Sequence, residues 1–436
     1  MAAGRDDGPP TRLARRLDLG DAVVVGLGAM IGAGVFSAIG PAADAAGAGL
    51  LVGLAVAAFV AYCNATSSAE LAARYPASGG TYVYGRERLG PLWGYLAGWG
   101  FVVGKTASCA GMALTAGAYA APAWQRPIAV AAVVGLTAVD YHGVRKTATV
   151  TRLVVALVLG ALALVVAGAA FGGRADAANL GPLTGNGAYG ILQSAGLLFF
   201  AFAGYARIAT LGEEVHDPAS TIPKAIPRAL GITLAVYALV AVSALAAVGP
   251  GPLAGSDTPL ATAVRAGSLE ALAPAVRVGG AIAALGVLLS LVAGVSRTAF
   301  AMAADGELPR WLGAVHPRHQ VPHRAVAAVG ALVAVIVSVV DLRDAIGFSS
   351  FCVLAYYAIA NAAAWTLPGE RRRRRRGLAA AGLVGCVTLA GTLPAGSALT
   401  GAATLAAGAA IRATRRAAGG RMRARPVGKV SSAEQG

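Results

Sequence analysis

Charge, histidine and cysteine are all scarce in this sequence, and each shortage excludes a class of protein. Only 13% of the 436 residues are charged, about half the share in an average soluble globular protein, whereas 57% are hydrophobic. This ratio excludes an ordinary water-soluble domain. No group of His, Ser, Cys or Asp side chains lines the apolar runs in a catalytic pattern, so we predict that the protein is not an enzyme.

The few histidines and cysteines also lack the spacing of ligand sets. The five histidines fall in connecting segments without the separations that metal sites use, so we predict neither a metal site nor a cofactor. The four cysteines lie inside apolar runs, where a buried thiol acts as a small hydrophobic side chain. They are Cys63, Cys109, Cys352 and Cys386.

What the sequence does contain is a series of apolar runs of about 17 to 25 residues, the length that crosses roughly 30 Å of hydrocarbon as a helix. The predicted fold class is therefore an all-α integral membrane protein with about twelve transmembrane helices. We place the spans at residues 21–46, 48–72, 91–120, 127–140, 150–171, 188–212, 229–248, 272–303, 325–341, 345–366, 377–393 and 396–411.

The net charge of +16 is a topology signal. In a soluble domain it would suggest nucleic acid, but here the basic residues gather in connections and tails, such as Arg371–Arg376 and the tail after 412. Basic segments beside spans hold the cytoplasmic side of a membrane protein against anionic lipid. We therefore expect a lipid bilayer as partner, and no nucleic acid.

The distribution of lysine and arginine predicts the orientation. Residues 1–19 carry no signal-peptide core, so the first span must target the chain. With both termini cytoplasmic, nearly all of the 36 basic residues fall on the cytoplasmic side of a multi-pass plasma-membrane protein. The exceptions are Arg126, Arg174, Arg265, Arg277 and Arg343 on the opposite side, and Lys105 within the third span.

Glycine marks interruptions in two spans. The first span contains Gly26, Gly28, Gly32 and Gly34 at mid-membrane depth, and each glycine costs a helix about 1 kcal/mol relative to alanine. The pattern fits either close helix packing or a broken segment that lines a ligand site, and we favour the second. The sixth span is interrupted at Gly204, after an aromatic cluster.

The positions of the two breaks predict the domain organisation. They open successive blocks of five spans, and a second five-helix block necessarily starts on the opposite side of the membrane from the first. This is the arrangement of an inverted-repeat transporter, with the binding site where the broken helices meet. We assign 1–19 to an N-terminal tail, 20–171 and 188–367 to the two repeats, 377–412 to two peripheral helices and 413–436 to a basic cytoplasmic tail.

Four segments, in order, resemble the amino acid-polyamine-organocation family of secondary transporters. They are Gly28-Ala-Met-Ile-Gly-Ala-Gly-Val-Phe36, Arg74-Tyr-Pro-Ala-Ser-Gly-Gly-Thr-Tyr-Val-Tyr84, Phe200-Ala-Phe-Ala-Gly204 with Glu213-Glu-Val-His-Asp-Pro218 and Ile222-Pro223, and Ala301-Met-Ala-Ala-Asp-Gly-Glu-Leu-Pro309 with Pro322-His-Arg324. The matches extend over nearly the whole chain.

The resemblance implies a substrate held by its amino-acid backbone at the two breaks. Free N–H groups at a helix start bind a carboxylate, and freed carbonyls accept hydrogen bonds from an ammonium. The N–H groups would come from Ile31, Gly32, Ala33 and Gly34. The carbonyls would come from Ala29, Phe199, Phe202 and Ala203, beside Gly204. Phe202, together with Phe199, would close over the substrate, although packing or a lipid-facing role fits each ring nearly as well.

The chain departs from the family pattern in its charges. Many members carry an acidic residue after the sixth-span glycines, but here Gly204 and Tyr205 precede Ala206. A cationic side chain at the midplane would need a carboxylate partner, so neutral amino acids are favoured over arginine or polyamines. The alternatives are a cationic amino acid or polyamine exchanger of the same fold and, in a different class, an amino-acid-gated channel or receptor.

The coupling ion is left open by the sequence. Some proton-coupled members place a lysine in the fifth span, where this chain has Val158, but a charged side chain does occur at Lys105. Lys105 is our candidate coupling residue, with a lysine that snorkels or faces a water-filled vestibule as the alternative. The eighth span offers the hydroxyls of Ser290, Ser296 and Thr298 to sodium. Coupling to H+ or Na+ and simple exchange all remain open, as do a monomer and a homodimer.

Charged residues at the cytoplasmic face are expected to form gating pairs, with solvated surface charge as the alternative. The candidates are Arg74, Arg86, Glu213, Glu214, Asp217, Arg297 and Asp305.

Overall fold

The computed structural model describes residues 17–75, 79–143, 148–205, 208, 215–368 and 372–423. This part of the chain is helical, with one isolated parallel β-bridge between Leu17 and Val215. The N-terminal tail up to residue 16 and the basic tail after residue 423 lie outside it, as do the gating candidates Glu213 and Glu214.

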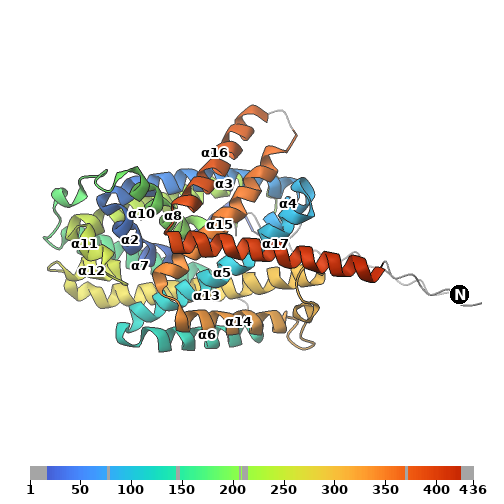
Figure 1. Cartoon of the computed structure of the whole chain (residues 1–436). Coiled ribbons are helices and arrows are strands. Elements are labelled where there is room, and N and C mark those ends of the chain that lie inside the picture. Colours follow the sequence, from blue (N-terminus) through green and yellow to red (C-terminus); the bar gives the residue numbers. More distant parts are fainter. Residues whose placement is uncertain are drawn as a thin grey trace, which may run out of the picture.

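The helices follow one another along the chain as Figure 1 colours them, with one break after α1 and another after α8. The first half contains α1 (Leu19–Met30), α2 (Ala33–Ala46), α3 (Leu50–Arg74), α4 (Thr81–Leu89), α5 (Pro91–Ala120), α6 (Gln125–Tyr141) and α7 (Ala148–Phe171). The second half contains α8 (Gly187–Phe202), η4 (Ala203–Tyr205), α10 (Pro218–Val248), α11 (Pro250–Ala254), α12 (Pro259–Arg265), α13 (Ala273–Ala304), α14 (His323–Val339) and α15 (Leu342–Trp365). Helices α16 (Arg372–Thr392) and α17 (Ala395–Arg423) follow.

Several of these helices can cross a membrane. By length and composition, six segments of the described chain qualify, and the bent pair α16 and α17 raises the number to seven if it counts as one span. Two shorter apolar helices are α1 and α14. The protein is thus a multi-pass helical membrane protein, and the count of twelve spans stays a prediction.

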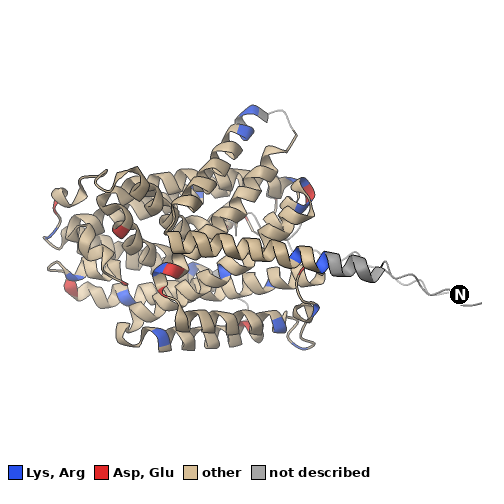
Figure 2. Cartoon of the chain, in the orientation of Figure 1, with Lys and Arg blue, Asp and Glu red and all other residues tan. Residues whose placement is uncertain are grey.

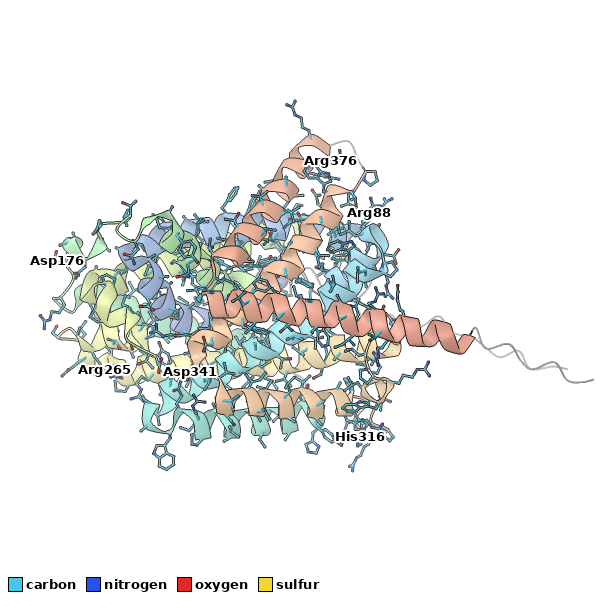
Figure 3. The ribbon with its side chains drawn as sticks, in the orientation of Figure 1. Arg88, Asp176, Arg265, His316, Asp341 and Arg376 are labelled. Atoms are coloured by element: carbon cyan, nitrogen blue, oxygen red, sulfur yellow. The ribbon has the colours of Figure 1, made fainter. Side chains whose placement is uncertain are left out.

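Charged residues concentrate at helix ends and connections, and leave most of the helical surface uncharged (Figure 2). Arg88 and His316 lie at one end of the bundle, and Asp176 and Arg265 lie at the opposite end (Figure 3). Arg88, predicted to be cytoplasmic, and Arg265, predicted to be external, therefore lie at opposite ends of the bundle, and the orientation itself stays a prediction.

Local signals explain where two of the helices begin. Asp18 and Asp21 form a capping box that starts α1 at Leu19. Helix α10 begins at Pro218, well before the predicted span at 229, because Asp217 caps it and proline is tolerated in the first turn. Lys224 and Arg228 lower the hydropathy of that first part without interrupting the helix.

The broken helices pack inside the bundle rather than at its edge. Helix α2 packs against α8, α3 also packs against α8, and α1 packs against α10. Helices α13 and α15 both pack along α5, while α15 and α16 run obliquely to most of the bundle (Figure 1). This arrangement brings the two breaks into contact.

The histidines and cysteines take the following places in the fold. Three histidines contact the ring of Tyr141 at the end of α6, and a fourth, His319, contacts one of them, His142. No group of three or more His, Cys, Asp or Glu in the described chain could hold a metal ion. The four cysteines are buried free thiols.

Candidate functional site

The first break is a tight turn centred on Ile31. Its backbone angles, φ −76° and ψ 75°, are those of an inverse γ-turn, in which the N–H of Gly32 donates to the carbonyl of Met30 over 2.8 Å. The N–H of Ile31 donates to Leu27 over 2.6 Å and so completes α1. Two of the four N–H groups predicted to be free are therefore used within the chain in this conformation.

The other two predicted donors remain at a helix start. Gly32 is extended and gives α2 no side-chain cap, so the helix begins at Ala33 with its N-terminal amides uncapped. Within the described chain, the N–H groups of Ala33 and Gly34 have no backbone acceptor outside the helix. The positive end of a helix dipole and two open amides are groups that can bind an anion such as a carboxylate.

The second break touches the first mainly through backbone atoms. Helix α8 ends at Phe202 and continues as the short 3-10 turn η4. A methyl group on Gly204 would lie 2.0 Å from the carbonyl oxygen of Ala29, and one on Gly34 would lie 2.6 Å from the Cα of Ala201. Glycine is required at both positions because larger residues would push the two broken helices apart.

Tyr237 of α10 joins the two breaks. Its hydroxyl lies 2.6 Å from the carbonyl oxygen of Met30 and 3.2 Å from that of Ala201. One hydroxyl proton cannot serve both acceptors fully, so the shorter bond to Met30 is the stronger. Sequence reasoning missed this residue, although a tyrosine in the interior of an apolar span signals a hydroxyl that needs a buried partner.

The two candidate gating rings are packed in the interior. Phe202 and Phe199 are both fully buried. Phe202 lies edge-on to Tyr237 with ring centroids 5.2 Å apart, and Phe199 lies edge-on to Tyr357 at 5.8 Å. Neither ring faces lipid, so the lipid-facing role considered from the sequence is excluded for both. The hydroxyl of Tyr357 also reaches the carbonyl oxygen of Ala203 at 3.4 Å.

Helix α13 closes the other side of the first break. A methyl group on Gly32 would lie 2.3 Å from a Val287 methyl, so no side chain separates the break from α13. The hydroxyls proposed for sodium all donate to carbonyls one turn earlier in α13, at 3.1 Å for Ser290, 2.7 Å for Ser296 and 3.0 Å for Thr298. Their oxygens keep acceptor capacity, which is what a cation needs.

Lys105 is buried in α5, with 8% of its surface exposed. Within the described chain it has neither an ion-pair partner nor a hydrogen-bond acceptor, and Cys109 lies one turn further along the same helix. An unpaired ammonium inside a membrane protein is costly, about 3 kcal/mol on insertion scales. The residue therefore stays a candidate for a functional charge.

Among the gating candidates, the structure joins Arg86 and Asp305. A guanidinium nitrogen of Arg86 lies 2.9 Å from Oδ2 of Asp305, and the hydroxyl of Tyr82 donates to the same oxygen over 2.6 Å. Burial and the hydrogen bond to Asp305 raise the pKa of Tyr82, so the phenol keeps its proton and donates. These contacts tie α4 to the end of α13.

Comparison with known proteins gives consistent matches. Residues 17–409 match a family model described as amino acid permease. A transporter of Mycobacterium tuberculosis (strain ATCC 25618 / H37Rv), named as uncharacterized, is 63% identical over 93% of this chain and 92% of its own. A branched-chain amino acid permease of Bacillus subtilis (strain 168) is 28% identical over 76% of each chain. Cationic amino acid transporter 4 of Homo sapiens is 29% identical over 80% of this chain and 59% of its own.

Proposed function

The chain belongs to the amino acid permease family and is an amino acid transporter, and we propose that it moves neutral amino acids across the plasma membrane by alternating access. The substrate backbone binds where the two breaks meet. Its carboxylate accepts from the N–H groups of Ala33 and Gly34, and its ammonium donates to carbonyls near Ala29 and Ala203. The observation that carries the proposal is the close approach of Gly204 to Ala29 and of Gly34 to Ala201, which supports a site shared by the two breaks.

The charge inside the bundle favours neutral substrates. No Asp or Glu occurs from Gly26 to Gly40 or from Ala195 to Tyr205. The two broken segments therefore contain no carboxylate that could pair with a cationic substrate side chain. The buried ammonium of Lys105 adds a positive charge, which repels a second cation. The branched-chain and the cationic relative are about equally similar to this chain, so the charges of the site carry more weight than either name.

The architecture we propose has twelve spans, ten of them in two inverted repeats of five with the breaks in the first and sixth spans. Both termini are cytoplasmic in this arrangement. Support comes from the breaks at Ile31 and Phe202 and from the separation of Arg88 and Arg265 to opposite ends of the bundle.

Uptake into proteoliposomes tests the function. Purified protein is reconstituted and screened with twenty labelled amino acids under an imposed proton gradient, an imposed sodium gradient or neither. We expect saturable uptake of neutral amino acids and acceleration by unlabelled substrate inside. A channel gives no such counterflow, and preference for arginine or a polyamine would favour the exchanger of cationic substrates instead.

Lys105→Met tests the proposed role of the buried ammonium. A proton moving across 100 mV supplies about 2.3 kcal/mol, enough to concentrate a substrate roughly fiftyfold. If Lys105 titrates in the cycle, its loss abolishes the pH dependence of uptake and accumulation falls to the equilibrium level. Lys224→Met, at an exposed lysine of α10, is the matched control and should behave as wild type. If uptake by Lys105→Met still depends on pH, Lys105 has no role in coupling.

Asp305→Ala tests the contact between α4 and α13 as a cytoplasmic lock. The Arg86 pair is about one-third exposed on both sides, so it contributes less than about 1 kcal/mol, and the hydrogen bond from Tyr82 to a carboxylate adds about 1.5–3 kcal/mol. We expect amide hydrogen exchange across α4 to speed up by about tenfold or more. Glu87→Gln, on the exposed face of the same helix, should leave exchange unchanged. Unaltered exchange in Asp305→Ala would mean that the pair does not hold α4.

A further inference from the structure

A polar cavity lies away from the two breaks, at the end of the bundle predicted to face outward. Its volume is about 240 Å³. Asp341, one of its lining residues, lies in the same half of the molecule as Asp176 and Arg265 (Figure 3). The lining comes from α5, the start of α6, the segment between α11 and α12, and the start of α15, with Leu114, Arg126, Asp257, Asp341, Leu342 and Arg343 as the residues used below.

The cavity holds charges of both signs. Arg126 pairs with Asp341 over 2.7 Å and also donates to the carbonyl of Ser338 over 2.8 Å. Arg343 pairs with Asp44 over 3.1 Å. Asp257 is exposed and has no ion-pair or hydrogen-bond partner within the described chain. Two guanidinium groups and one unpaired carboxylate therefore face a space large enough for several water molecules or a small ligand.

These groups match the ends of a free amino acid. A guanidinium binds a carboxylate with charge-assisted hydrogen bonds, and a carboxylate binds an ammonium in the same way. In the existing pair the side chain of Arg126 is 42% exposed and that of Asp341 is 76% exposed. Breaking this ion pair so that Arg126 can bind a ligand therefore costs less than about 1 kcal/mol. Leu114 and Leu342 leave an apolar part of the wall for a short aliphatic side chain.

The cavity also adjoins contacts that close this end of the bundle. Arg343 bridges Asp44, near the end of α2, and the carbonyl of Ala254 in α11. A methyl group on Gly40 of α2 would lie 3.0 Å from the carbonyl of Ser256, so the segment between α11 and α12 rests directly on α2. A ligand carboxylate that recruits Arg343 weakens this tie between the segment and the broken first span.

We infer that this cavity is an outer subsite for a zwitterionic amino acid, in which Asp257 receives the ammonium and Arg126 with Arg343 receives the carboxylate. The inference rests on the proposed transport function. It adds a second binding position for the same class of substrate, separate from the helix breaks.

Sidedness of transport kinetics tests the outer subsite. The probe is the labelled amino acid with the strongest counterflow in the screen, measured for uptake from each face of oriented proteoliposomes. Asp257→Asn and Arg126→Gln should each raise the KM about five- to tenfold for substrate presented at the cavity face. The KM at the other face and the maximal rate should stay within twofold of wild type. Asp257→Glu should restore most of the affinity.

The control is Asp344→Asn, an exposed acid in the first turn of α15 outside the cavity lining, which should match wild type. An unchanged KM in Asp257→Asn, or an equal rise at both faces, would overturn the subsite. If Asp257→Asn raises the KM but Arg126→Gln does not, the cavity is a cation site, and the assignment to a zwitterion is overturned as well. If none of the twenty amino acids shows counterflow, it is the transport function itself that fails, so the two failures are distinguishable.

Discussion

Gly204→Ala is expected to reduce amino acid uptake by about 10- to 100-fold while the protein remains folded in detergent. The added methyl group would lie 2.0 Å from the carbonyl oxygen of Ala29, 2.3 Å from its carbon and 2.7 Å from the nitrogen of Met30. All three atoms are backbone, so no side-chain rotation can make room. Overpacking of this kind costs about 1–3 kcal/mol or more, and each 1.36 kcal/mol is tenfold in rate.

The measurement is counterflow in proteoliposomes, with size-exclusion profiles to show that the variant is folded. Gly231→Ala is the matched control, because Gly231 lies inside α10 with nothing within 4 Å of the added methyl group. It should transport as wild type and gain slightly in stability, since alanine favours helix over glycine. Wild-type uptake by Gly204→Ala would mean that the contact between the breaks is not part of the transport site.

Tyr237→Phe is expected to raise the Kd for the amino acid about tenfold. The substitution removes only the hydroxyl that reaches the carbonyls of Met30 and Ala201, and it leaves the edge-on packing against Phe202 intact. The carbonyl of Met30 keeps its bond from the N–H of Gly32, so the substitution removes one buried hydrogen bond, which costs about 0.5–1.5 kcal/mol, from the residues that align the two breaks.

Tyr95→Phe is the control for this prediction. Its hydroxyl is buried without a hydrogen-bond partner in the described chain, so its removal should be neutral or stabilising. Equilibrium dialysis of the labelled amino acid against the purified protein gives its Kd for each variant. Equal affinities for wild type and Tyr237→Phe would show that the hydroxyl does not hold the breaks in the binding geometry.

The breaks themselves could be predicted from the sequence because their cause is local. Gly28, Gly32 and Gly34 weaken the helix and Gly204 ends the aromatic run of α8, whatever surrounds them. The open amides of Ala33 and Gly34 follow from the helix start after Gly32. The γ-turn at Ile31 could not be predicted, because it depends on backbone angles that hydropathy does not encode, and it uses two of the predicted donors internally.

The parts that could not be predicted depend on contacts between distant segments. Tyr237 lies more than 200 residues from Met30, so only the packing of α1 against α10 brings its hydroxyl to the break. The short helices α4, α11 and α12 are too short or too polar for a hydropathy signal. Their positions decide which charges meet, as with Arg86 and Asp305, whose pairing was one of several equally possible combinations.

Recognition of the amino acid backbone at the breaks is tested most directly by competition in a counterflow assay. Labelled leucine, or whichever neutral amino acid is transported best, is challenged with its decarboxylated amine, its deaminated acid and the intact unlabelled amino acid. If the amides of Ala33 and Gly34 hold the carboxylate while carbonyls near Ala29 and Ala203 hold the ammonium, only the intact amino acid should compete at low concentration. The amine and the acid, which each carry only one of the two charges, should each compete about 100-fold more weakly or worse. Competition by the amine or the acid as strong as that of the amino acid would contradict backbone recognition at this site.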